Sequence, residues 1–277
     1  MLCPEKIEVI EMENTPKKQI TRKLCWWITE KCNENCVYCF RSLSSINRFT
    51  LEEHMEILKG IIAFGTEQIT WSGGEALLVP HATELIKYAK EHGIYNKITT
   101  NGKLLTPEKI EELKPYVDLV ALSIDSLDDT TNKALGRGVE HRSTVINRIR
   151  HLMQEGIQVD INTVVMRTNI QDLDEMGSFF RENPISGKWK LMTFFPVRER
   201  ALANKEKLEI DDAVFLAEVH RLIEKYQDVN IMYMMNDQIQ QQYPGVRANG
   251  DLLVTRQFQD MILGNMMDGN VRNPFLF

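Results

Sequence analysis

Short apolar segments alternate with longer amphipathic segments through the first two thirds of the chain. Each apolar segment has the length of a buried strand, and each amphipathic segment has apolar residues at helical spacing. Caps mark several helix starts, such as the capping box from Thr50 to Glu53 and the proline at position 107. The predicted strands are residues 24–29, 68–71, 97–100, 119–124, 157–166 and 188–194. The predicted helices are residues 50–64, 80–92, 107–113, 142–155 and 171–180.

Strands that alternate with helices through short loops form a parallel sheet. Six such units are too few to close an eight-stranded barrel, so the pattern predicts an α/β fold, a partial (βα)6 TIM-like barrel. After residue 196 the pattern changes to a long helix over 210–226, a short strand near 229–233 and a turn-rich tail. We therefore expect a lead-in over residues 1–21, a barrel core over 22–196 and a small α+β C-terminal extension over 197–277.

Composition narrows the classes of partner. The 277 residues carry a net charge of −6, which argues against nucleic acid or an anionic membrane as the partner. The N-terminal residues lack the apolar stretch of a signal peptide, and no apolar run is long enough to span a bilayer. Five cysteines, three of them clustered, suit a reducing compartment, so the sequence predicts a cytoplasmic protein.

The three clustered cysteines are the most informative chemical feature. Cys32, Cys36 and Cys39 have the spacing C-x3-C-x2-C on one predicted loop. Three thiolates can bind three irons of an iron–sulfur cube and leave the fourth iron open, whereas a structural zinc site needs four ligands and no second ligand pair exists here. Cys25 lies in an apolar run and is interpreted as a small buried hydrophobe.

Further polar and glycine residues stand at the ends of the predicted strands. The carboxyl ends of parallel strands meet at one edge of a sheet, where ligands bind, although turn chemistry alone also favours such residues at strand ends. These residues are Ser72, Gly73, Gly74, Glu75, Thr100, Asn101, Ser123, Asp125 and Asn162.

The cysteine spacing, with Tyr38 just before the last cysteine, resembles that of the radical S-adenosylmethionine (SAM) enzymes. The resemblance covers residues 22–196. It implies that the three cysteines hold one [4Fe–4S] cluster, that SAM chelates the open iron, and that an external donor of the flavodoxin or ferredoxin type reduces the cluster. SAM is then cleaved to methionine and a 5′-deoxyadenosyl radical, which abstracts a substrate hydrogen.

The resemblance also assigns the strand-end residues to SAM. Gly73, Gly74 and Glu75 correspond to the family's GGE motif, which binds the SAM amine, and either Arg137 or Arg142 would contact the SAM carboxylate. The remaining positions implied to line the SAM path are Tyr38, Ser72, Thr100, Asn101, Ser123, Asp125 and Asn162.

The tail suggests one substrate class. A hairpin around Asn249 and Gly250, followed by residues 262–266, resembles the SPASM or twitch extension of peptide-modifying radical SAM enzymes. No cysteine follows Cys39, so the resemblance implies an extension without auxiliary clusters. The first hypothesis is therefore a peptide substrate in ribosomal peptide natural product maturation. A separate leader-peptide-recognition protein would then be needed, because no recognition domain precedes residue 22.

Other segments resemble viperin, a radical SAM family that dehydrates CTP. They are Cys39–Phe40, residues 136–138 and the Lys188-Trp189-Lys190 segment, whose lysines could hold a triphosphate. Asp160 stands where that family has a lysine, and a carboxylate there would repel phosphate. A nucleotide or another small polar metabolite is the second hypothesis, and a non-catalytic iron–sulfur or SAM-binding protein is the third.

Overall fold

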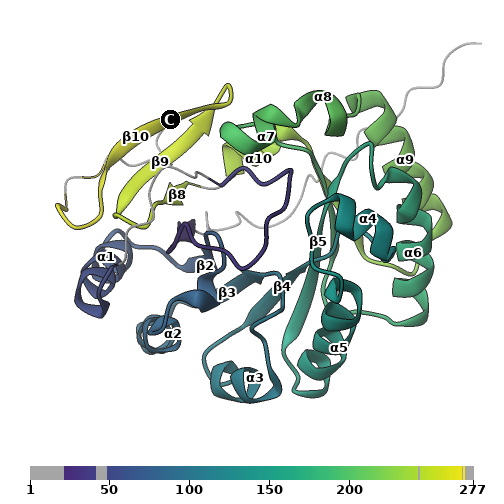
Figure 1. The fold of residues 1–277 in the computed structure, drawn as a ribbon. Coiled ribbons are helices and arrows are strands. Elements are labelled where there is room, and N and C mark those ends of the chain that lie inside the picture. The colour runs from purple at the N-terminus through teal and green to yellow at the C-terminus, as the bar shows by residue number, and fades with distance from the viewer. Residues whose placement is uncertain (1–21, 42–48, 243, 270, 272–277) are drawn as a thin grey trace, which may run out of the picture.

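The computed structural model describes residues 22–41, 49–242, 244–269 and 271; the predicted lead-in over residues 1–21, with Cys3, lies outside them. The described strands form one sheet that curves into an open barrel (Figure 1). Their order is β10-β9-β8-β1-β2-β3-β4-β5-β6-β7. The strands are β1 (Lys23–Trp27), β2 (Gln68–Ser72), β3 (Tyr95–Thr100), β4 (Leu119–Ser123), β5 (Gln158–Val165), β6 (Trp189–Thr193), β7 (Ile231–Met234), β8 (Gly245–Val246), β9 (Asp251–Arg256) and β10 (Gln259–Asn265).

All neighbouring strands from β1 to β7 are parallel, which confirms the predicted α/β fold with a partial barrel. The short strand expected near residues 229–233 is β7, and it continues the parallel sheet beyond β6. β8 pairs in parallel with β1 and antiparallel with β9, which confirms the hairpin around Asn249 and Gly250. β9 and β10 then form an antiparallel ribbon at the end of the sheet.

The two helices with predicted caps, at Thr50 and Pro107, begin where those caps predict. The Thr50 hydroxyl accepts from the Glu53 amide at 3.2 Å, and the Glu53 carboxylate accepts from the Thr50 amide at 2.7 Å. The six-residue α4 was not predicted, because one and a half turns carry too little periodicity to recognise. None of the helices in the described part of the chain could cross a membrane. The helices are α1 (Leu51–Ala63), α2 (Ala82–Glu91), α3 (Pro107–Leu113), α4 (Asp129–Ala134), α5 (His141–Gln154), α6 (Leu173–Glu182), α7 (Glu199–Ala203), α8 (Lys205–Leu208), α9 (Asp212–Lys225) and α10 (Asn236–Gln242), with 3-10 turns at Ala76–Leu78 and Ile170–Asp172.

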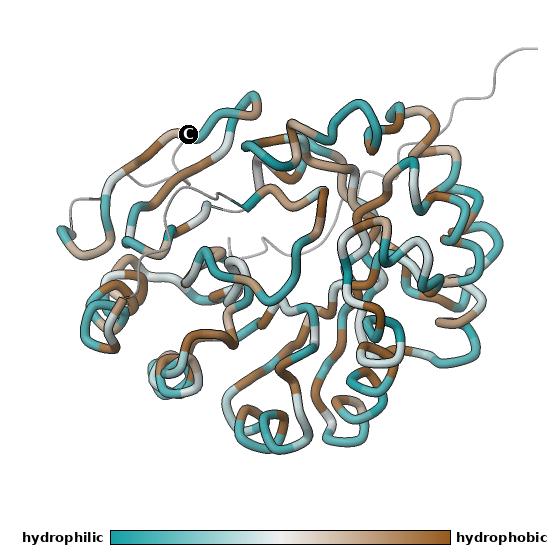
Figure 2. Tube along the Cα trace, viewed as in Figure 1, coloured by the Kyte–Doolittle hydropathy of each residue, from teal (hydrophilic) through white to brown (hydrophobic). Residues whose placement is uncertain are grey.

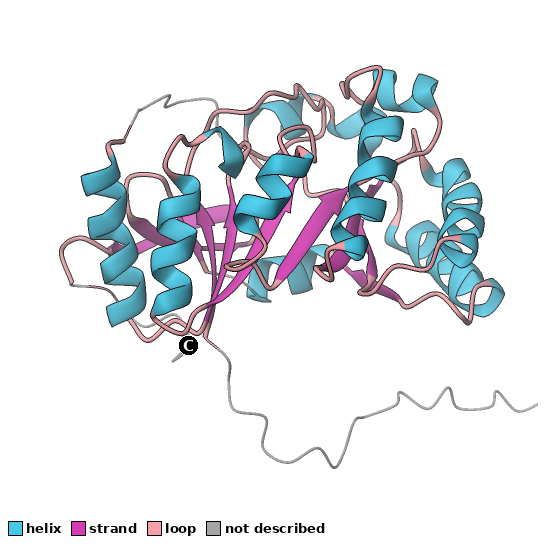
Figure 3. Ribbon diagram, turned by 90° about the horizontal axis from the view of Figure 1, so that it is seen from below, coloured by secondary structure: helices cyan, strands magenta, loops and turns pink. Residues whose placement is uncertain are grey.

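The main apolar core lies between the strands and the helices outside them. Alternate strand residues such as Trp26, Trp71, Ile98 and Trp189 are fully buried in this layer. Figure 2 shows the strands as largely hydrophobic, and Figure 3 shows the helices ranged along the sheet. The other residues of each strand face the inside of the barrel, so strand alternation decides which side chains reach an interior site.

Candidate active site

The loop that carries the three cysteines packs directly against the turn that follows β2. The Gly74 amide donates to the Thr29 carbonyl at 2.6 Å, and the Glu75 amide donates to the Lys31 carbonyl at 2.7 Å. A Cβ on Gly73 would lie 2.3 Å from the Thr29 oxygen, and one on Gly74 would lie 2.0 Å from the Lys31 oxygen. Both glycines are therefore required for the close approach of two backbone segments, and this contact places the cysteine loop at the mouth of the barrel.

Glu75 joins this turn to the end of β3. Its carboxylate is buried and accepts from the Thr100 hydroxyl at 2.9 Å and from the Asn101 amide at 3.0 Å. Burial raises the pKa of Glu75 above its ordinary value. The Asn101 side chain in turn donates to Asn33 at 2.7 Å and lies 3.9 Å from the Cys32 sulfur. The structure thus brings together three groups of residues that the sequence placed at separate strand ends.

A buried triad fixes the other side of the cysteine loop. The Tyr38 hydroxyl donates to the Asp125 carboxylate, and the Arg137 guanidinium binds the same oxygen through Nη2 at 2.7 Å and Nε at 3.2 Å. Burial raises the pKa of Tyr38 well above its ordinary value, so the phenol remains a donor. The second Asp125 oxygen accepts from the Val164 amide at 3.0 Å, which ties the triad to β5.

Of the two candidate arginines, only Arg137 reaches the site. Gly136 allows its approach, because a Cβ there would lie 2.4 Å from the Asn35 oxygen in the cysteine loop. Arg142 is exposed on the first turn of α5 and lines a separate surface hollow. The glycines that flank Arg137 were the signal in the sequence that could have separated the two.

The three cysteines are free thiols that fit an iron–sulfur cluster. Cys36 is buried, Cys32 and Cys39 are half-buried, and none forms a disulfide. No three His, Cys, Asp or Glu side chains within residues 22–41, 49–242, 244–269 and 271 are placed to bind a single metal ion. In a [4Fe–4S] cluster each thiolate binds a different iron, so the three sulfurs need not converge on one point. The loop therefore suits a cluster better than a mononuclear metal.

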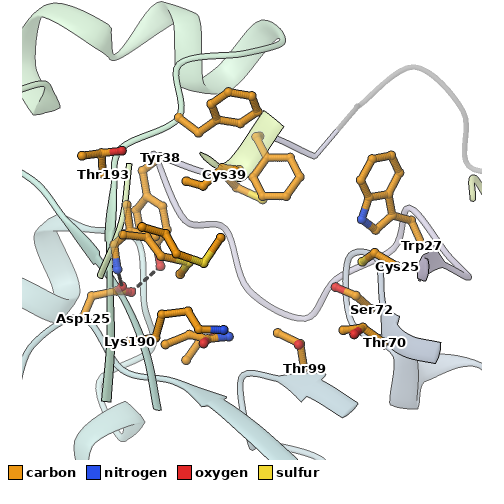
Figure 4. Close-up of a pocket in the computed structure, with 18 of the residues that line it drawn as sticks. Cys25, Trp27, Tyr38, Cys39, Thr70, Ser72, Thr99, Asp125, Lys190 and Thr193 are labelled. Atoms are coloured by element: carbon orange, nitrogen blue, oxygen red, sulfur yellow. Dashed lines mark hydrogen bonds between the residues drawn. The ribbon is translucent and has the colours of Figure 1, made fainter. Parts of the chain in front are cut away.

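A cavity of about 320 Å³ lies beside this loop inside the barrel. Figure 4 shows Tyr38 and Cys39 on one side of it, with Lys190 and Thr99 across from them. Of the predicted site residues, Tyr38, Cys39, Ser72, Ser123, Asp125, Arg137 and Asn162 line the cavity. Cys32, Cys36, Gly73, Gly74, Glu75, Thr100 and Asn101 are not among its lining residues.

The cavity walls divide into a polar floor and an aromatic wall. The aromatic wall is formed by Trp27, Phe40 and Phe195, with ring centroids 6.3 Å apart between the first two and 6.1 Å apart between the last two. The floor consists of inward-facing strand residues, whereas closed barrels fill these positions with branched aliphatic side chains. The floor residues are Cys25, Gln68, Thr70, Ser72, Lys97, Thr99, Ser123, Asn162 and Lys190.

The interpretation of Cys25 as a small buried hydrophobe was wrong, because Cys25 does not lie in the apolar core. It is half-buried and faces the cavity, while its neighbours Leu24 and Trp26 are fully buried on the opposite face of β1. Burial raises the pKa of Cys25 to about 12, so it remains a protonated thiol. Alternate residues of β1 face opposite sides of the sheet, and this alternation was the sequence signal that could have placed Cys25 on the cavity side.

Lys190 and Asn162 are polar groups without partners on this floor. The two residues are register neighbours on β6 and β5, and the Asn162 side-chain oxygen is buried without a hydrogen bond. Lys190 forms no ion pair or hydrogen bond that involves its ammonium within the described part of the chain. Burial, with a contribution from nearby Lys97, lowers the pKa of Lys190 to about 8. The ammonium and the amide oxygen are free to bind a polar ligand.

The open parallel barrel holds the three-thiol loop at its strand ends, beside a cavity with an aromatic wall and polar residues on its floor. This arrangement defines an enzyme that works with an iron–sulfur cluster and a small-molecule cofactor. The family model described as Radical SAM superfamily matches residues 27–180. The chain therefore belongs to the radical SAM superfamily, whose members bind a [4Fe–4S] cluster and SAM.

Curated relatives resemble the chain in sequence, and solved structures resemble it in fold. The chain is 30% identical to an S-adenosylmethionine-dependent nucleotide dehydratase of Lacinutrix mariniflava, over 80% of this chain and 48% of that protein. It is also 30% identical to one from Flammeovirga pacifica, over 75% of this chain and 77% of that protein. SuiB of Streptococcus suis bound to SAM has a TM-score of 0.71 at 18% identity, covering 89% of this chain and 63% of SuiB. At that identity the likeness to SuiB shows the shared fold alone. The chain spans about half the length of the Lacinutrix relative.

Proposed function

We propose that this chain uses one [4Fe–4S] cluster and SAM to dehydrate a nucleotide. The observation that carries the proposal is the unpaired Lys190 beside Asn162 on the cavity floor, in a chain 30% identical to two nucleotide dehydratases. An unpaired ammonium in a buried cavity favours an anionic substrate group such as phosphate.

The cofactor residues follow from the geometry around the cysteine loop. Cys32, Cys36 and Cys39 would hold the cluster, and because no cysteine follows Cys39 in the sequence, we propose one cluster only. The positions proposed for SAM are Ser72, Gly73, Gly74, Glu75, Thr100, Asn101, Ser123, Asp125, Arg137, Asn162 and Tyr38. When bound, the cluster and SAM supply a 5′-deoxyadenosyl radical that takes a hydrogen atom from the substrate. An external one-electron donor of the flavodoxin or ferredoxin type would reduce the cluster. The same donor would supply a second electron, together with a proton from solvent, when the substrate radical loses its hydroxyl as water.

The chain itself would bind and orient the nucleotide and exclude water. Lys190 would bind its phosphate, and Thr70 and Thr99 place hydroxyls on the floor for the sugar. Trp27 and Phe40 cover the cavity beside Cys39, which keeps water from the reacting carbon.

The Asp160 carboxylate is placed so that it would not repel the phosphate of a bound nucleotide. Its carboxylate pairs with Lys97 at 3.0 Å and accepts from the Lys188 amide at 3.0 Å, and it does not line the cavity. Its charge is therefore compensated within the protein.

A peptide substrate is the second candidate, supported by the cysteine-free hairpin of β9 and β10. A structure of SuiB bound to the precursor peptide SuiA is also known, so SuiB itself binds a peptide. For this chain, a peptide substrate and a leader-peptide-recognition partner stay predictions.

Anaerobic turnover separates the two candidates. We expect the reconstituted protein with SAM and dithionite to form 5′-deoxyadenosine faster when a nucleotide is added, and mass spectrometry to detect a product that has lost one water. Lys190→Met should lose the nucleotide effect while keeping the slow background cleavage of SAM. Stimulation by a peptide but by no nucleotide would reject the proposal.

The pH dependence of nucleotide binding gives an independent check. Lys190 is protonated below its pKa of about 8, and the charges near it are Lys97, Asp160, Lys188 and Lys23. An anion binds the protonated form, so the Kd of the nucleotide is expected to rise about tenfold per pH unit above pH 8. Lys190→Arg, which stays charged, should flatten this profile. An unchanged slope in Lys190→Arg would contradict the assignment.

A further inference from the structure

The cations on the cavity wall are mostly neutralised by buried or half-buried carboxylates. Lys97 pairs with Asp160 at 3.0 Å, and Arg137 pairs with Asp125 at 2.7 Å. Arg198 pairs with Asp260 at 2.7 Å. Among the described residues that line the cavity, Lys190 is then the cation without a carboxylate partner.

Lys97 lies on the cavity floor, and its partner Asp160 lies outside the cavity lining. Ala121 is the register partner of both Thr99 on β3 and Asp160 on β5, and its small side chain leaves room for Lys97 to reach across β4. The Lys97 and Asp160 side chains are only 12% and 8% exposed. A Cβ on Gly187 would lie 2.3 Å from the Asp160 carboxylate, so the glycine lets the backbone approach this carboxylate, which also accepts from the Lys188 amide at 3.0 Å.

Separating this pair to free Lys97 for a substrate would leave Asp160 buried and uncompensated. Such a change is strongly unfavourable in a protein interior. The cavity therefore offers one free positive charge to an anionic substrate, although it contains several basic side chains.

We propose that Asp160 limits the phosphate charge of the substrate, so that the cavity accepts a nucleoside monophosphate in preference to a triphosphate. This inference rests on the proposed nucleotide substrate. The single phosphate of a monophosphate is matched by the ammonium of Lys190. A triphosphate brings further negative charges that would be desolvated without a partner, and specificity arises from this penalty.

Binding of a nucleotide series tests the inference. The 5′-mono-, di- and triphosphates of each common ribonucleoside are titrated against the reconstituted enzyme with SAM, with and without Mg²⁺. The monophosphate is expected to bind at least about tenfold more tightly than the triphosphate. Tighter binding of the triphosphate under either condition overturns the inference but leaves the nucleotide substrate in place. If no nucleotide binds, the proposed function itself fails.

Charge variants of the buried pair test the role of Asp160. Asp160→Asn releases the charge of Lys97 and should shift the preference toward the triphosphate by about tenfold. Lys97→Met changes the charge in the opposite direction and should strengthen the preference for the monophosphate. The nucleotide series on the wild-type enzyme keeps the inference falsifiable if neither single variant folds. The double variant Lys97→Met/Asp160→Asn restores the net charge and should return the wild-type preference. Equal preference in all variants would show that Asp160 does not set specificity.

Discussion

Replacing Cys36 by alanine is expected to remove the iron–sulfur absorbance and SAM cleavage together. The Cys36 side chain is buried on the loop that the Gly73–Gly74 turn and the Tyr38 triad hold in place. Loss of one thiolate leaves two protein ligands for a cluster that needs three from this loop. Iron content, the visible spectrum and 5′-deoxyadenosine formation measure the effect, and Cys32→Ala and Cys39→Ala should behave alike.

Cys25→Ala is the matched control for the cysteine variants. Cys25 is also a free thiol and lines the same cavity, but it lies on β1 rather than on the cysteine loop. Its variant should retain full iron content. A normal cluster spectrum in Cys36→Ala, or loss of the cluster in Cys25→Ala, would contradict the ligand assignment.

Replacing Arg137 by leucine is expected to lower the free energy of unfolding by about 3–5 kcal/mol, because it leaves the buried Asp125 carboxylate without its cation. The Arg137 and Asp125 side chains are only 5% and 1% exposed, so solvent screens their interaction little. The Tyr38 hydroxyl also depends on this carboxylate, so the cysteine loop should loosen and reconstitute less iron. Urea unfolding measures the loss of free energy of unfolding. The iron content after reconstitution measures the effect on the cysteine loop.

Arg142→Leu supplies the control for this variant. It makes the same substitution on an exposed residue of α5, outside the cavity, and should change the stability by less than about 0.5 kcal/mol. Equal stability loss in the two variants would show that the Asp125 triad is not a special support of the loop.

The sequence predicted the elements of the site better than their contacts. Local sequence patterns were enough to find the three cysteines, Cys32, Cys36 and Cys39, from their spacing. They were also enough to find the polar residues at the ends of the strands. Local patterns could not show that Tyr38 and Asp125, which are far apart along the chain, share a hydrogen bond. The glycines that flank Arg137 were a local signal that favoured it over Arg142, but the contact that they allow depends on where the segment after α4 meets the cysteine loop.

Three further findings depended on long-range register. The glycines of the GGE motif admit the backbone of the cysteine loop, which is a contact between segments far apart in sequence. Lys97 is neutralised across β4 by Asp160, so its charge cannot be judged from its own strand. Three helices, α7, α8 and α9, separate β7 from β6 in the sequence, so the place of β7 beside β6 follows from packing rather than from the strand–helix rhythm.

The pairing of β8 with β1 has a consequence for how the protein is made. β1 is the first described strand to leave the ribosome, yet one of its two neighbours is β8, near the other end of the chain. Until β8 is synthesised, one edge of β1 exposes unpaired amide and carbonyl groups, which other nascent chains or chaperones can bind. The cysteine loop follows β1 directly. The wall that supports the cluster is therefore completed only after β8 has left the ribosome, which sets the earliest moment at which iron can be loaded into a finished barrel.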